Sequence, residues 1–136
     1  MPVVTFTLQR PEAELAVFGE ASFQPVLERF SGGRDEDGPI FRHHAAVLVS
    51  EPWNRYDHDA FGVHICDELG ATDQIGYLSH EDAVAYAPIL DLVGPAVPMC
   101  LVTLGRGWDR GPYDRANFDA VLNLGTPAEM AAEWYY

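Results

Sequence analysis

Short apolar segments recur along the chain, most of them alternating with polar residues, and this period of two predicts β-strands. The segments are 3–8 (VVTFTL), 15–21 (LAVFGEA), 45–51 (AAVLVSE), 61–66 (FGVHIC), 74–78 (QIGYL), 96–104 (AVPMCLVTL) and 117–124 (NFDAVLNL). The segment 45–51 is apolar on both faces, and 96–104 is the longest apolar segment. Only short connections separate the three strands between residues 45 and 78, so we expect an antiparallel meander there.

Three other segments have the pattern of short helices. Residues 23–30 (FQPVLERF) carry an apolar face with a proline near the start and a Gly-Gly pair soon after the end. Ser79 and Asp82 form a capping box for a second helix, which Pro88 is expected to break or kink. Thr-Pro-x-Glu opens a third helix at 127–134.

The number and length of these elements predict a mainly β fold, an OB-like or SH3-like six-stranded barrel with two or three short helices. The 136 residues fit one domain, 1–136, with a hydrophobic core. Hydrophobic residues make up 48% of the chain, which excludes a disordered protein. We find no signal peptide and no apolar run of about 18 residues, so we expect a cytoplasmic protein. Cys66 and Cys100 are expected to be reduced and buried.

The charge of the chain limits what it can bind. The formal net charge is −13, which repels nucleic acids and anionic membranes at long range. At physiological salt this repulsion is screened over about 8 Å. A local pocket can therefore bind an anionic polymer where a broad groove cannot.

The segment 51–63 (EPWNRYDHDAFGV) has the composition of a turn between two strands. Its proline, asparagine and aspartate residues are sufficient to favour the backbone conformation of a turn. They do not explain Trp53, Arg55 and Tyr56. The turn is therefore a candidate functional site.

Three motifs together carry a family resemblance: VFGEASFQPVLERF, EPWNRYDHDAFGVHI and IGYLSHEDAVAYAPIL. With the glycine-rich GRGWDRG, they closely resemble the HIRAN family over residues 15–125, in the form of a stand-alone bacterial member. The resemblance implies a small β-barrel related in shape to nucleic-acid-binding barrels. In members attached to DNA translocases, such a domain reads single-stranded DNA ends that have a free 3′ hydroxyl. Tyr56 and Asp57 match the family's aromatic–carboxylate pair, and Asn54 matches its asparagine.

Elementary chemistry is consistent with these assignments. The face of Tyr56 can stack on any base, which contributes about 1–3 kcal/mol. Asp57 can accept a hydrogen bond from a hydroxyl while repelling a phosphate. Arg55 and Asn54 would assist, Arg55 by holding the next phosphate. Phe23 would form the opposite wall of the pocket.

The early strand departs from the family pattern. DNA-end-binding relatives carry an arginine and an aromatic residue there, whereas this chain has Glu20, Ala21, Ser22 and Phe23. No cation replaces the missing arginine, and Glu20 adds a negative charge. We therefore expect weaker phosphate binding.

Structural roles for the same turn residues remain open. Asp57 would then accept backbone N–H groups while Tyr56 covers the end of the barrel, and the two roles of this pair are compatible. Trp53 is expected to be a packed lid rather than a platform for a base. Arg55 could instead pair with Asp59 or Glu51.

Two loops differ in their charge. Residues 32–40 (GGRDEDGPI) form an acidic loop, expected to be solvated. Residues 105–119 (GRGWDRGPYDRANFD) balance three arginines against three aspartates and are locally neutral. If this second loop lies beside Tyr56, then Trp108 and Arg110 would complete a binding face. Otherwise it is a solvated loop held by one aromatic residue.

The sequence contains no catalytic motif of the serine hydrolase, Walker or zinc protease type, so we expect neither an enzyme nor a cofactor. Asp57, His58 and Asp59 are adjacent on an extended segment and would point to opposite sides, so no metal site is expected. Two functions remain. One is binding of a single-stranded DNA end. The other is a protein-interaction module, with Trp53, Trp108 and the C-terminal aromatic residues as anchors and a partner such as a DNA-processing enzyme.

Overall fold

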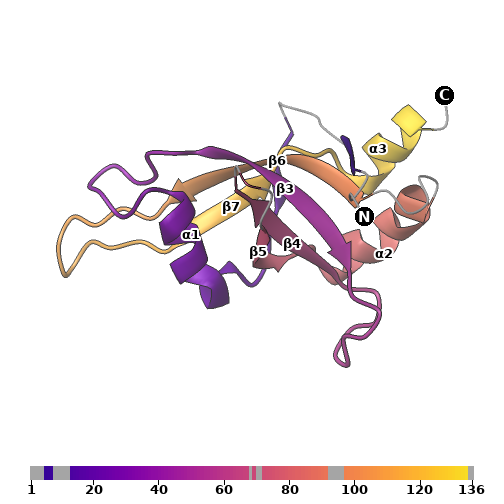
Figure 1. Ribbon diagram of the computed structural model, residues 1–136, viewed down its shortest axis with the longest axis horizontal. Helices are drawn as coiled ribbons and strands as arrows, with labels where there is room; N and C mark the ends of the chain where they lie inside the picture. The colour runs from indigo at the N-terminus through magenta and orange to yellow at the C-terminus, as the bar shows by residue number, and fades with distance from the viewer. Residues whose placement is uncertain (1–4, 8–12, 68, 70–71, 92–96, 135–136) are drawn as a thin grey trace.

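The computed structural model is one curled sheet with helices at its ends and edge (Figure 1). It describes residues 5–7, 13–67, 69, 72–91 and 97–134, and the side chains at 5–7, 97 and 131–134 are outside this description. The strands are β1 (Thr5–Thr7), β2 (Leu15–Ala16), β3 (His43–Ser50), β4 (Phe61–Cys66), β5 (Thr72–Tyr77), β6 (Val97–Arg106) and β7 (Phe118–Leu122). The helices are η1 (Glu20–Phe23), α1 (Gln24–Phe30), α2 (His80–Asp91) and α3 (Pro127–Trp134).

Six antiparallel strands form a curled half-barrel in the order β2-β7-β6-β3-β4-β5, and β1 adds to β6 in parallel. The two edges of the curl meet where Phe18 and Tyr77 exchange backbone hydrogen bonds of 2.8 Å. Gly76 permits this approach, because a Cβ there would lie 2.6 Å from the carbonyl oxygen of Phe18. The predicted mainly β fold with short helices is confirmed, as is the β3-β4-β5 meander.

The core lies inside the curl and explains the apolar pattern of the strands. Leu27 of α1, Tyr86 of α2 and Phe118 of β7 are among its largest fully buried side chains. Both cysteines are free: Cys100 is buried and Cys66 is half-buried. Burial raises the pKa of the Cys100 thiol to about 12, so it is protonated at neutral pH.

The helix ends follow the predicted capping signals, with one exception. At the start of α3, Thr126 and Glu129 exchange the two hydrogen bonds of a capping box, at 3.0 and 3.3 Å. The predicted break at Pro88 is wrong, since α2 continues to Asp91. Pro88 and Val84 are both exposed, so the carbonyl group of Val84, which loses its helical partner, can be hydrated.

No helix in the described residues is long and apolar enough to cross a membrane.

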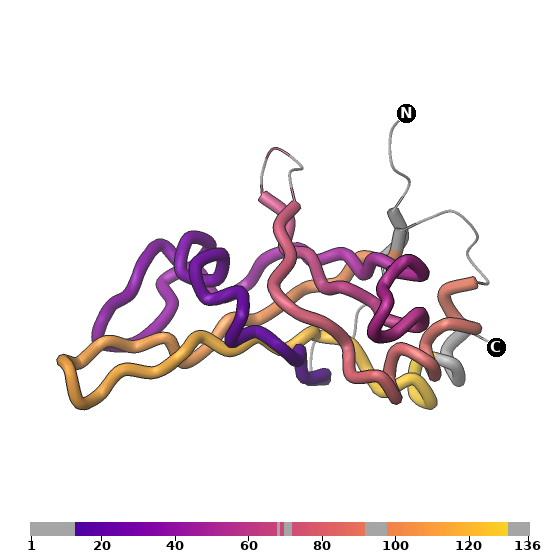
Figure 2. Tube along the Cα trace, turned by 90° about the horizontal axis from the view of Figure 1, so that it is seen from below, coloured from indigo at the N-terminus to yellow at the C-terminus, as the bar shows by residue number. Residues whose placement is uncertain are grey.

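The acidic loop after α1 lies along the loop that joins β6 to β7, and the two extend together from one end of the molecule (Figures 1 and 2). Arg34 donates to the carbonyl oxygen of Ala116 at 2.8 Å, and its guanidinium lies over the Phe118 ring at 4.7 Å. The backbone of Asp109 donates to that of Asp35 at 2.8 Å. The acidic loop is therefore anchored through its backbone and Arg34, and is not freely solvated as the sequence suggested.

Candidate nucleic-acid interface

Asn54 organises the turn between β3 and β4, residues 51–60. Its Oδ1 accepts the backbone N–H of Tyr56 at 2.9 Å and that of Asp57 at 3.3 Å. Its Nδ2 donates to Oε1 of Glu51 at 3.1 Å. An asparagine oxygen that binds the N–H groups two and three residues later stabilises a turn locally. Asn54 thus fixes the backbone that presents Tyr56 and Asp57.

The exposed residues of this turn include the three that its backbone does not require. Tyr56 is 91% exposed and Trp53 is 69% exposed. Arg55 is also exposed, and in the described part of the chain it forms no ion pair. Trp53 is therefore not a packed lid, and Tyr56 does not cover the end of the barrel. The aromatic faces are open to another molecule.

Asp57 is held in place by one backbone and one side-chain partner. Its Oδ1 accepts the N–H of Asp59 at 2.9 Å, and its Oδ2 lies 2.8 Å from Nδ1 of His80, the first residue of α2. The hydrogen bond with His80 lowers the pKa of Asp57 and raises that of His80. Sequence reasoning missed His80, because it is 23 positions from Asp57 and only the tertiary fold brings the two together.

Glu51 forms the buried base of the turn, with only 7% of its surface exposed. Its Oε2 lies beside Gly62 of β4, where a Cβ would come within 2.6 Å of it and within 3.2 Å of Nε2 of His64. Burial lowers the pKa of His64, which favours a neutral imidazole beside the carboxylate. The glycine leaves room for the carboxylate that binds Asn54.

The remaining predicted site residues do not join the turn. Phe23 lies in η1, half-buried, and no contact described in the structure links it to Tyr56. Trp108 and Arg110 lie in the β6–β7 loop, towards the opposite end of the long axis (Figures 1 and 2). There the guanidinium groups of Arg106 and Arg110 lie 5.0 and 4.8 Å from the centre of the Trp108 ring. The loop therefore does not complete a face with Tyr56.

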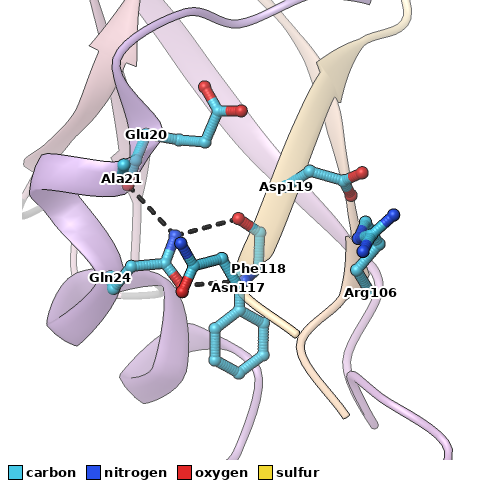
Figure 3. Close-up of a pocket in the computed structure, with 7 residues that line it drawn as sticks. All are labelled: Glu20, Ala21, Gln24, Arg106, Asn117, Phe118 and Asp119. Carbon is cyan, nitrogen blue, oxygen red and sulfur yellow. Dashed lines mark hydrogen bonds between the residues drawn. The ribbon is translucent and has the colours of Figure 1, made fainter. Parts of the chain in front are cut away.

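A hollow of about 260 Å³ lies where η1 meets β7 (Figure 3). Its lining residues are Glu20, Ala21, Gln24, Arg106, Asn117, Phe118 and Asp119. The Gln24 amide is already engaged, since it donates to the carbonyl oxygens of Glu20 and Phe118 and accepts the N–H of Phe118. Two carboxylates beside one guanidinium do not favour a phosphate here.

A larger hollow, about 570 Å³, opens beside Ile40 and Phe41, whose side chains are 62% and 60% exposed. It extends to His43, His44 and Cys66. Within the described residues, no three His, Cys, Asp or Glu side chains lie close enough together to hold a metal ion. The turn at 51–60 therefore remains the best-defined candidate site.

Comparison with known proteins yields no match to this chain, whether to a family model, to a characterised protein or to a solved structure. The HIRAN resemblance remains a prediction that rests on the motifs in the sequence.

Proposed function

We propose that this chain binds the 3′-hydroxyl end of single-stranded DNA through the turn at 51–60, the function that the HIRAN resemblance implies. The observation that carries the proposal is the 91% exposure of the Tyr56 ring next to a carboxylate whose pKa is lowered. An aromatic face stacks on any base and contributes about 1–3 kcal/mol per base. Tyr56 would thus provide affinity without sequence preference.

Asp57 would provide the preference for a hydroxyl. An ionised carboxylate only accepts hydrogen bonds, and each of its oxygens has two acceptor positions. Its bonds with Asp59 and His80 use one position on each oxygen. A terminal hydroxyl can donate to a remaining position, whereas a terminal phosphate, with a charge of about −1.5 to −2, is repelled.

The net charge of −13 agrees with a small site of this kind. Repulsion acts along the whole length of a bound strand, so binding should involve only the terminal nucleotide and its neighbour. Arg55 is exposed in the turn and would contact the preceding phosphate. With one such contact, the logarithm of the affinity should fall with a slope of only about −0.7 against the logarithm of the salt concentration.

A second candidate function is a protein-interaction module. Ile40 and Phe41 are 62% and 60% exposed side by side at the hollow of about 570 Å³, and contiguous exposed apolar side chains mark protein contacts. Trp53 is 69% exposed on the turn. Of the other predicted anchors, Trp108 is only partly exposed and lies between two guanidinium groups. The side chains of Trp134, Tyr135 and Tyr136 lie outside the described residues.

Fluorescence anisotropy at low salt distinguishes the two functions. The probes are a short single-stranded oligonucleotide with a 3′ hydroxyl and the same oligonucleotide with a 3′ phosphate. We expect tighter binding of the hydroxyl end. Tyr56→Ala should weaken it by about 5- to 150-fold, the equivalent of losing one base stack.

Tyr113→Ala is the matched control, because Tyr113 is fully exposed in the β6–β7 loop, far from the turn. It should bind as the wild type does. Absence of binding to either oligonucleotide would exclude the DNA-end function and favour the interaction module. Equal weakening by the two tyrosine variants would show that the stacking site is not the turn.

A further inference from the structure

The contact between His80 and Asp57 bears on the chemistry of the bound end. Nδ1 of His80 lies 2.8 Å from Oδ2 of Asp57. An ionised carboxylate has no hydrogen to donate, so Nδ1 must carry the proton of this bond. The other ring nitrogen, Nε2, has no hydrogen-bond partner in the described part of the chain. The side chain is 64% exposed, so a ligand bound at Asp57 can reach it.

The protonation state of His80 changes what Nε2 offers to a ligand. In the neutral ring, with Nδ1 protonated, Nε2 is an acceptor, which suits the O–H of a terminal hydroxyl. In the charged ring, Nε2 becomes a donor, which suits the oxygens of a phosphate. The added positive charge also offsets the repulsion from Asp57. The His80 ring is therefore suited to a hydroxyl end at high pH and to a phosphate end at low pH.

Other charged groups around His80 are mostly acidic. Asp59 and Glu81 both favour its protonated form, as does Asp57 itself. His58 lies on the same turn as Asp57, but its Nδ1 is 2.9 Å from the carbonyl oxygen of Pro52, so it acts on the carboxylate of Asp57 only through its charge. Of the two imidazoles near this carboxylate, only His80 is hydrogen-bonded to it.

We propose that His80 is a second end-reading residue: it accepts a hydrogen bond from a terminal hydroxyl when neutral and donates one to a terminal phosphate when protonated. The preference for hydroxyl ends then weakens as the pH falls. This inference rests on the proposed function of the turn, since it concerns the ligand of that same site.

The test compares the affinities for the 3′-hydroxyl and 3′-phosphate oligonucleotides at about pH 8.5 and about pH 5.5, on either side of the ordinary histidine pKa. In the wild type, we expect the preference for the hydroxyl end to fall by about fivefold or more at the lower pH. In His80→Gln, which keeps a polar side chain that cannot be charged, the preference should change much less. The phosphate itself gains a proton near pH 6, but this effect is common to both proteins and cancels in the comparison.

His58→Gln is the control for a general loss of histidine charge, and it should retain the pH dependence of the wild type. An equal pH dependence in the wild type and His80→Gln would overturn the inference while leaving the proposed function intact. So would loss of the pH dependence in His58→Gln alone. If the wild type bound neither end at either pH, the proposed function and this inference would both be wrong. Circular dichroism of each variant verifies that it is folded.

Discussion

Gln24 pairs with the main chain of Phe118 as a neighbouring β-strand would. Its Oε1 accepts the N–H of Phe118 at 2.7 Å, and its Nε2 donates to the carbonyl oxygen of Phe118 at 2.9 Å (Figure 3). Strand β2 covers the same edge of β7 only from Leu122 to Ala120. The Gln24 side chain thus satisfies the backbone N–H and carbonyl groups at the end of this edge, which β2 does not reach.

Gln24→Ala should lower the free energy of unfolding by about 1–3 kcal/mol, because it leaves a partly buried N–H and carbonyl group without partners. Urea denaturation measures the change. Asn117→Ala is a suitable control, because Asn117 is exposed at the rim of the same hollow, and its effect should stay within about 0.5 kcal/mol. A similar loss in both variants would argue against a special role for Gln24 at the edge.

Asn54→Ala should make the backbone of the turn at 51–60 more mobile without unfolding the protein. The substitution removes the acceptor of the Tyr56 and Asp57 N–H groups and the donor to Glu51, at a cost of about 1 kcal/mol for the exposed part of this network. Amide hydrogen exchange followed by NMR should show faster exchange at positions 56 and 57 and little change in β3 and β4. Unchanged exchange at these two amides would mean that the turn is held by other contacts.

Local signals in the sequence predicted the regular elements well. The strands at 61–66 and 118–122 follow from alternation, and the Thr126–Glu129 capping box forms as expected. The composition of the turn at 51–60 correctly indicated a connection between two antiparallel strands. Each of these features depends on residues that are close together in the chain.

Features that depend on distant residues could not be predicted. The acidic loop was expected to be solvated because its composition is polar, but Arg34 lies against Phe118, 84 positions further on. The contact of His80 with Asp57 requires β4 and β5 to bring α2 back to the turn. The exposure of Trp53 was also missed, since a large aromatic residue is usually buried.

The His80–Asp57 pair should make stability depend on pH. The pKa of His80 is raised above 6.5, so its contribution to stability is complete below pH 6.5 and is lost as the pH rises through the folded-state pKa. The pKa of Asp57 is lowered below 3.8, so its contribution is present above pH 3.8 and is lost as the pH falls through the folded-state pKa. The pair therefore stabilises the fold most between pH 3.8 and pH 6.5.

Thermal denaturation of the wild type and His80→Gln checks this window. The difference in Tm should be largest near pH 5 and should shrink above neutral pH. Only the protonated imidazole carries a full positive charge that attracts the Asp57 carboxylate. His58→Gln should show a much smaller maximum, because its ring is not hydrogen-bonded to the carboxylate and its charge has the smallest effect on the pKa of Asp57. A Tm difference that stays constant from pH 4 to pH 9 would contradict the assignment of the charge pair.

Gly62→Ala tests whether the buried carboxylate of Glu51 supports the turn. Replacing a strand glycine by alanine normally stabilises a protein by about 0.5–1 kcal/mol. At Gly62 the new Cβ would lie 2.6 Å from Oε2 of Glu51, which is buried and must move. We therefore expect a net loss of about 1–3 kcal/mol together with faster amide exchange at Tyr56 and Asp57, because Glu51 holds Asn54.

Gly105→Ala in β6 is the matched control. Its Cβ would also lie 2.6 Å from a carboxylate oxygen, that of Asp119, but this side chain is only partly buried and can rotate towards solvent. Gly105→Ala should therefore be neutral or stabilising, with unchanged exchange in the turn. If Gly62→Ala destabilised the protein but left the exchange of Tyr56 and Asp57 unaltered, Glu51 would support the sheet and not the turn.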